Sequence, residues 1–278
     1  MSLRASLRIR RRLPDGDQQP QEPSSGAPIE FAGLEKRFGE TVALAGVSFS
    51  CRAGTVTALI GPNGAGKSTL LLAAAGLIAA DAGSVGVGGH PAGTPEAQRG
   101  LSLMPEQPDL YPGVSVWEHA AFIGLLYRVS AWQARAEQLL ERFGLSDRRD
   151  ALPHELSQGL RRRLALVMAL LHGADTLLLD EPFNGLDPRN SSELRALIAE
   201  LAAAGACVLV ATHILSDVEK LTDRAIVLER GRKRAEGTLD ELRGLAGLGR
   251  DADLEAVYLA LTDATACGPG IAEDPCLP

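Results

Sequence analysis

The sequence predicts an α/β fold with a mostly parallel sheet and an inserted α-helical subdomain. Two observations carry this prediction. Short apolar runs, such as 176–179 and 207–211, alternate with helical stretches, which is typical of parallel strands buried on both faces and joined by right-handed crossovers. Residues 114–172 instead carry several amphipathic helical patterns and no strand pattern. At 278 residues the chain has room for one large domain with a smaller insert.

The first segment of the chain has the composition of an appendage. Five arginines lie within the first 12 residues, and 14–28 is rich in Pro, Gln, Ser and Gly, so we expect 1–28 to be a disordered extension. Basic residues can tether a chain to anionic lipid, but a basic cluster without an apolar face binds weakly. The predicted main domain is 29–264, and a flexible Gly/Pro-containing tail is expected over 265–278.

Strands and helices are expected in alternation after residue 29. Residues 47–50 alternate apolar and polar side chains like a half-buried strand, and 55–60 is β-branched and apolar like a buried one. Glycines then mark a turn, and 67–75 is strong helix material that ends at Gly76. Further helices are predicted over 191–204, 214–221, 239–243 and 253–261.

Composition excludes several classes of function. The net charge of −7 argues against a dedicated nucleic-acid binder held by phosphate contacts. Four cysteines without C-x-x-C spacing indicate neither a zinc site nor a disulfide framework, and they suit a reducing compartment. The longest apolar stretch, 70–80, is far shorter than the roughly 18 residues that a membrane span needs. We therefore expect a soluble chain.

Residues 61–68 read Gly-Pro-Asn-Gly-Ala-Gly-Lys-Ser and match G-x-x-x-x-G-K-[ST] between a predicted strand and a predicted helix. Glycines let consecutive backbone N–H groups turn toward a polyphosphate, and the helix N-terminus adds its positive end. The Lys67 charge would reach the β- and γ-phosphates, and the Ser68 hydroxyl would bind Mg²⁺. The motif predicts a P-loop core that binds a nucleotide. The predicted nucleotide-binding residues here are Gly61, Pro62, Asn63, Gly64, Ala65, Gly66, Lys67, Ser68 and Thr69.

An acidic pair follows the apolar run 177–179. Asp180 ends that run, where a parallel strand reaches the ligand crevice of an open sheet, and we expect it to hold the Mg²⁺ shell. Glu181 should point elsewhere, because successive strand residues alternate sides, and we expect it to activate water. Adjacent acids can also merely cap a turn. Their place downstream of a P-loop favours the catalytic interpretation.

With these motifs the sequence resembles the nucleotide-binding subunit of an ABC transporter, over 29 to about 262. Residues 156–160, Leu-Ser-Gln-Gly-Leu, are similar to the family signature Leu-Ser-Gly-Gly-Gln, with two departures. The resemblance implies a small antiparallel β subdomain beside the core. It also implies that Ser157 and Gly159 contact the γ-phosphate bound to the opposite subunit. From the residues alone, Ser157 is also a helix N-cap.

Four further residues resemble family positions. Gln107, within 104–108, is similar to the Q-loop glutamine that senses Mg²⁺ and the γ-phosphate. Asp187 ends a segment similar to the D-loop, 184–187, and is implied to contact the trans nucleotide. His213 resembles the catalytic switch histidine, and Phe38 resembles the aromatic that stacks on adenine. Without the resemblance, three of them have simpler interpretations. Gln107 would be an ordinary loop residue, His213 a structural hydrogen bonder, and Phe38 a core residue of the β subdomain.

The resemblance implies partners as well as residues. Two ATPase subunits, identical or paralogous, would pair head to tail around ATP, and hydrolysis would let them part while an integral membrane permease moves the substrate. The chain would lie on the cytoplasmic face of the plasma membrane, without nucleic acid. Segments 212–219, 223–228 and 254–259 resemble the bacterial drug- and antibiotic-exporter type. The alternatives are an importer subunit and a soluble ABC-type ATPase with a non-transport partner. A small-molecule kinase would leave the signature unexplained.

Overall fold

The computed structural model describes residues 28–219 and 221–262. The extension predicted for 1–28 lies outside the described residues apart from Pro28, and so does the tail predicted for 265–278. Within the described part, no helix combines the length and the apolar character needed to cross a bilayer.

The central sheet contains six strands in the order β10-β9-β3-β8-β7-β6. Neighbouring strands from β9 to β6 pair in parallel, and β10 is antiparallel to β9. The apolar runs form its centre because β3, β7 and β8 are buried along their whole length. The strands are β3 (Val56–Ile60), β6 (Leu101–Met104), β7 (Thr176–Asp180), β8 (Cys207–Thr212), β9 (Arg224–Glu229) and β10 (Arg232–Gly237). The predicted mostly parallel sheet is confirmed.

A second, antiparallel sheet has the order β2-β1-β4-β5. Its strands are β1 (Ile29–Phe38), β2 (Thr41–Cys51), β4 (Ala82–Val87) and β5 (His90–Pro91). Phe31 faces Phe49 across β1 and β2, with ring centroids 4.4 Å apart. These rings share one core with helix α1 (Lys67–Ala74) and one face of the central sheet. The small antiparallel subdomain therefore packs directly on the helix that follows the P-loop.

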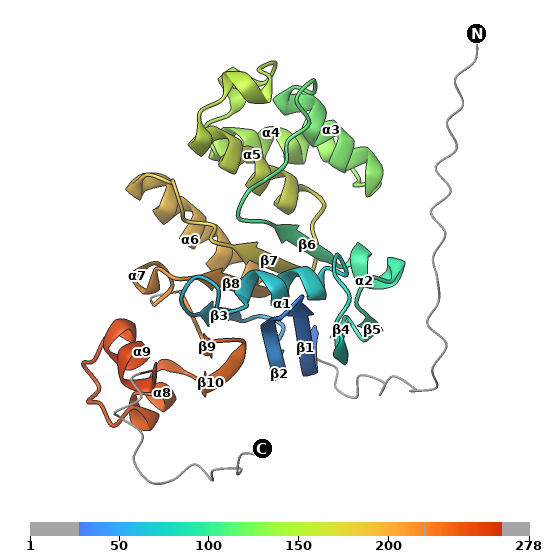
Figure 1. The fold of residues 1–278 in the computed structure, drawn as a ribbon. Helices are drawn as coiled ribbons and strands as arrows, with labels where there is room; N and C mark the ends of the chain where they lie inside the picture. The colour runs from blue at the N-terminus through green and yellow to red at the C-terminus, as the bar shows by residue number, and fades with distance from the viewer. Residues whose placement is uncertain (1–27, 220, 263–278) are drawn as a thin grey trace, which may run out of the picture.

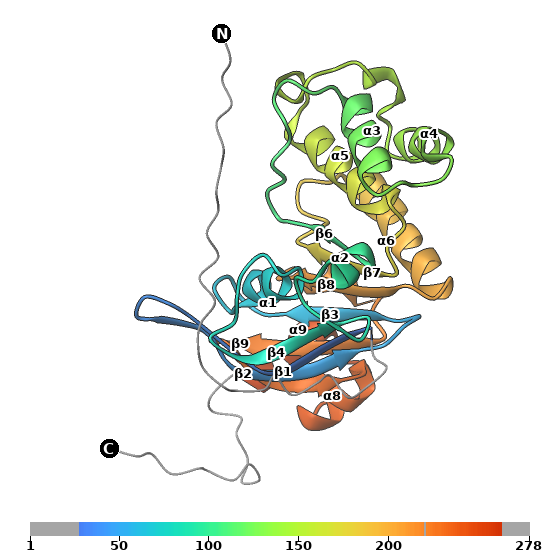
Figure 2. The ribbon, with the colours of Figure 1, turned by 90° about the vertical axis from the view of Figure 1, so that its right-hand side faces the viewer.

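Three long helices are inserted between the adjacent strands β6 and β7: α3 (Val116–Leu126), α4 (Trp132–Arg142) and α5 (Gln158–Leu171). Figures 1 and 2 show them together at one end of the molecule, away from the antiparallel sheet. Ser115 begins α3 with a capping box to Glu118, and Ser157 accepts a hydrogen bond from Leu160 N at 3.3 Å to begin α5. The predicted helical insert is present, and two 3₁₀ turns, Ser146–Arg148 and Pro153–Glu155, precede α5.

The remaining helices are α2 (Pro95–Arg99), α6 (Pro188–Ala203), α7 (Leu215–Val218), α8 (Leu239–Leu245) and α9 (Leu254–Thr262). The prediction of a helix over 214–221 was wrong in length, since α7 covers four residues. At its start Ile214 has an extended backbone, and after its end Leu221 N and Thr222 N both donate to the Val218 carbonyl oxygen (2.9 Å each), which closes the helix in a turn. Helix α6 begins three residues earlier than predicted, because Asp187 caps it and Pro188 occupies its first position.

Candidate functional site

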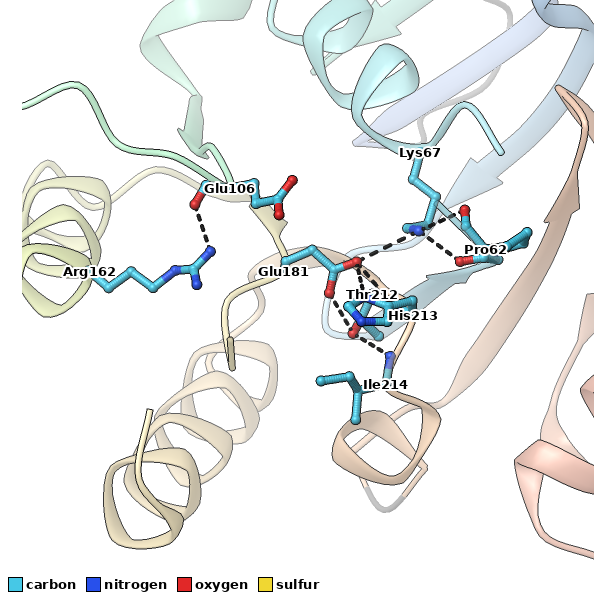
Figure 3. Close-up of polar contacts among 9 residues, drawn as sticks. Pro62, Lys67, Glu106, Arg162, Glu181, Thr212, His213 and Ile214 are labelled. Carbon is cyan, nitrogen blue, oxygen red and sulfur yellow. Dashed lines mark hydrogen bonds and ion pairs between the residues drawn. The ribbon is translucent and has the colours of Figure 1, made fainter. Parts of the chain in front are cut away.

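The loops that follow β3, β7 and β8 meet at one edge of the central sheet. These strands are parallel, so their carboxyl ends lie together and deliver three loops to the same place. The loop after β3 carries the P-loop, the one after β7 begins with Glu181, and the one after β8 begins with His213. Figure 3 shows Lys67, Glu181, Thr212 and His213 gathered at this edge.

The P-loop needs its glycines for two different physical reasons. Gly64 and Gly66 have φ of 81° and 103°, left-handed values that side chains disfavour. Gly61 lacks space instead, because a Cβ there would lie 2.2 Å from the Leu228 carbonyl oxygen. Gly66 precedes α1 without a side-chain cap, which leaves the first N–H groups of the helix for an anion. The local geometry is that of a phosphate cradle.

Lys67 is the first residue of α1, directly after this loop, and is 6% exposed. Its Nζ donates to the carbonyl oxygens of Gly61 (2.7 Å) and Pro62 (3.2 Å) and lies 3.7 Å from Glu181 Oε1. Burial lowers the pKa of Lys67, and the carboxylates of Glu181 and Asp180 oppose that shift. The ammonium group is therefore held between the loop and two acids, where it can reach phosphate oxygens.

Asp180 ends β7 and is 5% exposed. Among the described residues, its Oδ1 is a buried acceptor without a hydrogen-bond partner. Burial raises the pKa of Asp180, while hydrogen bonding with the Ser68 hydroxyl opposes the rise. A buried carboxylate oxygen without a partner is costly, and a hard divalent cation would satisfy it. Asp180 and Ser68 thus supply oxygen donors that fit Mg²⁺.

Glu181 turns out of the strand with φ of 47°, a left-handed value that is strained for a residue with a side chain. The turn, and not strand alternation, aims its carboxylate at the end of β8. There Oε2 accepts from Thr212 Oγ1 (3.0 Å), and Oε1 accepts from His213 N (3.1 Å). His213 Nδ1 lies 2.8 Å from the same Oε1. Glu181 is 4% exposed, and these contacts hold its carboxylate in one orientation (Figure 3).

Sequence reasoning missed Thr212, whose hydroxyl donates to Glu181 and accepts from Ile214 N (3.0 Å). One hydroxyl can do both, because it carries one donor and two lone pairs. The available signal was a threonine that ends a buried strand immediately before His213. Its partner could not be identified without the neighbouring strand.

Glu106 is the second residue that sequence reasoning missed. A cleft of about 390 Å³ beside the P-loop is lined by Phe38, Lys67, Glu181 and Glu106, among others. A neighbouring hollow of about 240 Å³ is lined by Ser68, Asp180, Glu106 and Gln107. The predicted Gln107 therefore lines the same hollow as the predicted metal ligands Ser68 and Asp180, which we call the metal side, and Glu106 lines both spaces. Its charge contributes to the raised pKa of Asp180.

Phe38 ends β1 and is 53% exposed at the rim of this cleft. The alternative that it is a core residue of the β subdomain is wrong. Lys36 Nζ lies 5.5 Å from the centroid of its ring. An exposed aromatic ring at the rim can offer its face to a base.

Ser157, Gly159 and Asp187 form a separate group, which we call the trans face. Ser157 and Asp187 are the N-caps of α5 and α6, so the N-cap interpretation of Ser157 is confirmed. A Cβ on Gly159 would lie 3.3 Å from the Gly185 carbonyl oxygen, which brings the signature (156–160) against the D-loop (184–187). Among the described residues that line the cleft beside Lys67, none belongs to the trans face.

Comparison with known proteins agrees with this geometry. A family model described as ABC transporter matches residues 44–184. Nod factor export ATP-binding protein I of Burkholderia lata is 40% identical over 215 residues, 76% of this chain and 71% of that protein. Daunorubicin resistance ATP-binding protein DrrA3 of Streptomyces coeruleorubidus is 38% identical over 224 residues, 79% of this chain and 71% of that protein.

Solved structures of ATP-binding subunits are also similar to this chain. One described as the ATP binding subunit of an ABC transporter has a TM-score of 0.80 at 34% identity, covering 84% of this chain and 99% of that chain. The resemblance and the fold class predicted from the sequence are confirmed. The chain belongs to the ABC transporter family and is an ATP-binding subunit, the part of such a transporter that acts as the ATPase.

Proposed function

We propose that this subunit binds MgATP, pairs head to tail with a second ATP-binding subunit and hydrolyses ATP to drive export through a membrane permease. The observation that carries the proposal is the separation of two half-sites. Lys67, Ser68 and Glu181 line the cleft, Asp180 and Ser68 line the neighbouring hollow, and the trans face lies outside the lining of both. Each half-site needs its complement from another subunit. Export is supported by relatives named for Nod factor export and daunorubicin resistance.

In the proposed mechanism each residue of the first half-site has a separate task. Lys67 and the P-loop N–H groups hold the phosphates, and Phe38 stacks on the adenine. Ser68 and Asp180 would hold Mg²⁺, together with Glu106 or Gln107. When bound, Mg²⁺ neutralises charge on the β- and γ-phosphate oxygens.

Hydrolysis is assigned to Glu181, which orients or deprotonates water. Its two oxygens are held by Thr212 and by His213, so no reorganisation of the carboxylate is needed at the moment of reaction. His213 also supports the γ-phosphate. Loss of that phosphate removes the bridge to the trans face of the second subunit, and the two subunits part.

The proposed permease surface lies where α3 meets the core. A groove of about 450 Å³ there is lined by residues of both parts, among them Leu103, Pro108, Ile123 and Tyr127. Large apolar side chains are exposed in its lining, Leu77 and Tyr127, and on the same helix α3, namely Phe122, Leu125 and Leu126. Exposed apolar patches of this kind mark protein interfaces. Docking there would hold the subunit on the cytoplasmic face of the plasma membrane, next to the Q-loop (104–108).

Replacing Ser157 with aspartate tests the head-to-tail dimer. Aspartate remains a good N-cap for α5, so the helix should persist. A carboxylate facing the γ-phosphate would repel it, because like charges about 4 Å apart at an interface cost a few kcal/mol. We expect ATP affinity of the monomer to be unchanged and ATP-dependent dimer affinity to fall by about 100-fold or more. Size-exclusion chromatography with Mg-free ATP measures the dimer.

Ser115→Asp is the matched control, because Ser115 is the N-cap of α3 and carries no predicted phosphate contact. It should dimerise like the wild type. A Ser157→Asp protein that dimerises with ATP at the same protein concentrations as the wild type would contradict the trans contact of Ser157, and with it the proposed head-to-tail arrangement.

Replacing Glu106 with glutamine tests the metal side. The change removes one negative charge from the hollow that Ser68 and Asp180 line, so we expect divalent cation affinity to fall about tenfold. Mn²⁺ titration of the protein–nucleotide complex, followed by electron paramagnetic resonance, measures it. Gln107→Ala is the comparison, and it should alter the affinity less. The opposite ranking would assign the metal contact to Gln107.

A further inference from the structure

Arg162 is a buried cation that joins two loops from distant parts of the chain. It is 7% exposed and lies in the first half of α5. Its Nη1 donates to the Asn184 carbonyl oxygen and its Nη2 to the Glu106 carbonyl oxygen, each at 2.6 Å. Figure 3 shows the side chain reaching from α5 to Glu106. One guanidinium thus spans the D-loop and the Q-loop.

Burying the Arg162 guanidinium in this way lowers the stability of the fold. Within 28–219 and 221–262, both partners of the guanidinium are backbone carbonyls, no carboxylate forms an ion pair with it, and its Nε is buried without a partner. Taking a charge out of water without a counter-ion costs several kcal/mol, which two hydrogen bonds only partly offset. What the planar fork does supply is a fixed spacing between two acceptors.

The two acceptors control the peptides that lead into functional residues. The Glu106 carbonyl belongs to the peptide that joins Glu106 to Gln107, on the metal side of the site. The Asn184 carbonyl belongs to the peptide before Gly185, whose own oxygen packs against Gly159. By holding both carbonyls, Arg162 therefore fixes the position of the metal side relative to the trans face.

The neighbouring arginines do not share this role. Arg161 Nε donates to Pro153 and Leu156 carbonyl oxygens (2.8 and 3.1 Å), inside the helical insert. Arg163 reaches the Phe143 carbonyl (3.3 Å) and lies 3.5 Å from Asp187 Oδ2. Among the three, Arg162 alone donates to the Q-loop in the described part of the chain.

We propose that Arg162 is a positioning residue that makes the Q-loop, the D-loop and the start of α5 move as one unit. The inference rests on the proposed function, because it couples the two half-sites defined there. A shift of the Q-loop on the metal side is carried through the guanidinium to Ser157, Gly159 and Asp187. The trans face is then aligned for a second subunit according to the state of the cis nucleotide.

The test compares full-length Arg162→Gln and Arg162→Lys with the wild type. Arg135→Gln is the matched control, because Arg135 Nη2 also donates to a backbone carbonyl of α5, Leu170 (2.9 Å), and touches neither loop. The measurements are the Kd of a fluorescent ATP analogue for the monomer, kcat, KM and the Hill coefficient for ATP hydrolysis, and the Tm. Glutamine keeps one donor group and loses the charge, and lysine keeps the charge and loses the fork.

For Arg162→Gln we expect the Kd to stay within about twofold, since the P-loop contacts are untouched. The kcat should fall about tenfold or more, and the Hill coefficient should move toward 1. Arg162→Lys should be intermediate, and Arg135→Gln should match the wild type. A structural role would lower the Tm without separating kcat from ATP affinity.

Two results would overturn the inference: a kcat and Hill coefficient within about twofold of the wild type, or a loss of ATP affinity equal to the loss of kcat. If Arg162→Gln does not fold, Arg162→Lys decides by the same criteria. A wild-type protein that hydrolyses ATP at full rate as a monomer would contradict the proposed function itself, so the two failures are distinguishable.

Discussion

Replacing Lys67 with alanine should abolish useful ATP binding, with affinity reduced by about 100-fold or more. Hydrogen bonds to charged groups contribute about 1.5–3 kcal/mol each, and the ammonium group is placed to make more than one of them with phosphate oxygens. Its removal also leaves Glu181 and Asp180 uncompensated beside the P-loop, which repels an anionic ligand. Equilibrium titration with a labelled ATP analogue measures the change.

Lys233→Ala is the control for this experiment. Lys233 forms an ion pair with Glu236 (2.7 Å) on β10, and it is not among the described residues that line the cleft. It should bind ATP like the wild type. Lys67→Ala also loses two hydrogen bonds to the P-loop carbonyls, so its circular dichroism and Tm should be recorded. A folded Lys67→Ala protein with unchanged ATP affinity would remove the assignment of 61–69 as the nucleotide site.

Replacing Glu181 with glutamine should leave ATP binding intact and lower the rate of hydrolysis by about 10²–10⁴-fold. Glutamine has the same shape, and its carbonyl oxygen can still accept from His213 N. Its amide can donate to Thr212 Oγ1, which as a hydroxyl can accept where it previously donated. The local structure is therefore kept while the basic oxygen is lost.

Phosphate release at saturating MgATP measures the rate, and the labelled analogue measures binding. Glu200→Gln serves as the control, because Glu200 pairs with Arg142 (2.9 Å) between α6 and α4, away from the cleft. The ATP-bound Glu181→Gln dimer should also persist on the column, since the bridging γ-phosphate stays. Turnover within about threefold of the wild type would exclude Glu181 as the base.

Several elements followed from local sequence. The P-loop was predictable because its requirements are local: glycines at left-handed or crowded positions, then a lysine and a serine that open a helix. The start of α5 at Ser157 was predictable for the same reason, since an N-cap acts within three residues. The length of α7 was not, because the helical pattern continued over 214–221 while the helix itself covers only Leu215–Val218.

In the candidate site, too, some features followed from local sequence and others depended on the tertiary structure. The positions of Asp180 and Glu181 at the end of β7 could be predicted from an apolar run that ends in two acids. The partners that orient Glu181, Thr212 and His213, could be identified only once β8 was known to lie beside β7. Glu106 and Gln107 are neighbours in the chain, and the path of the Q-loop past Ser68 decides that Glu106 lines the nucleotide cleft.

By itself, the sequence determined the family, the P-loop and the position of the two acids that follow the strand, because these depend on residue types at short, constant spacing. Tertiary structure alone decided which side chains meet. The three consecutive arginines of α5 are chemically identical, yet a helix turns about 100° per residue and sends each in a different direction. Only the folding of 106 and 184 onto the same face of α5 gives Arg162 two carbonyls to hold.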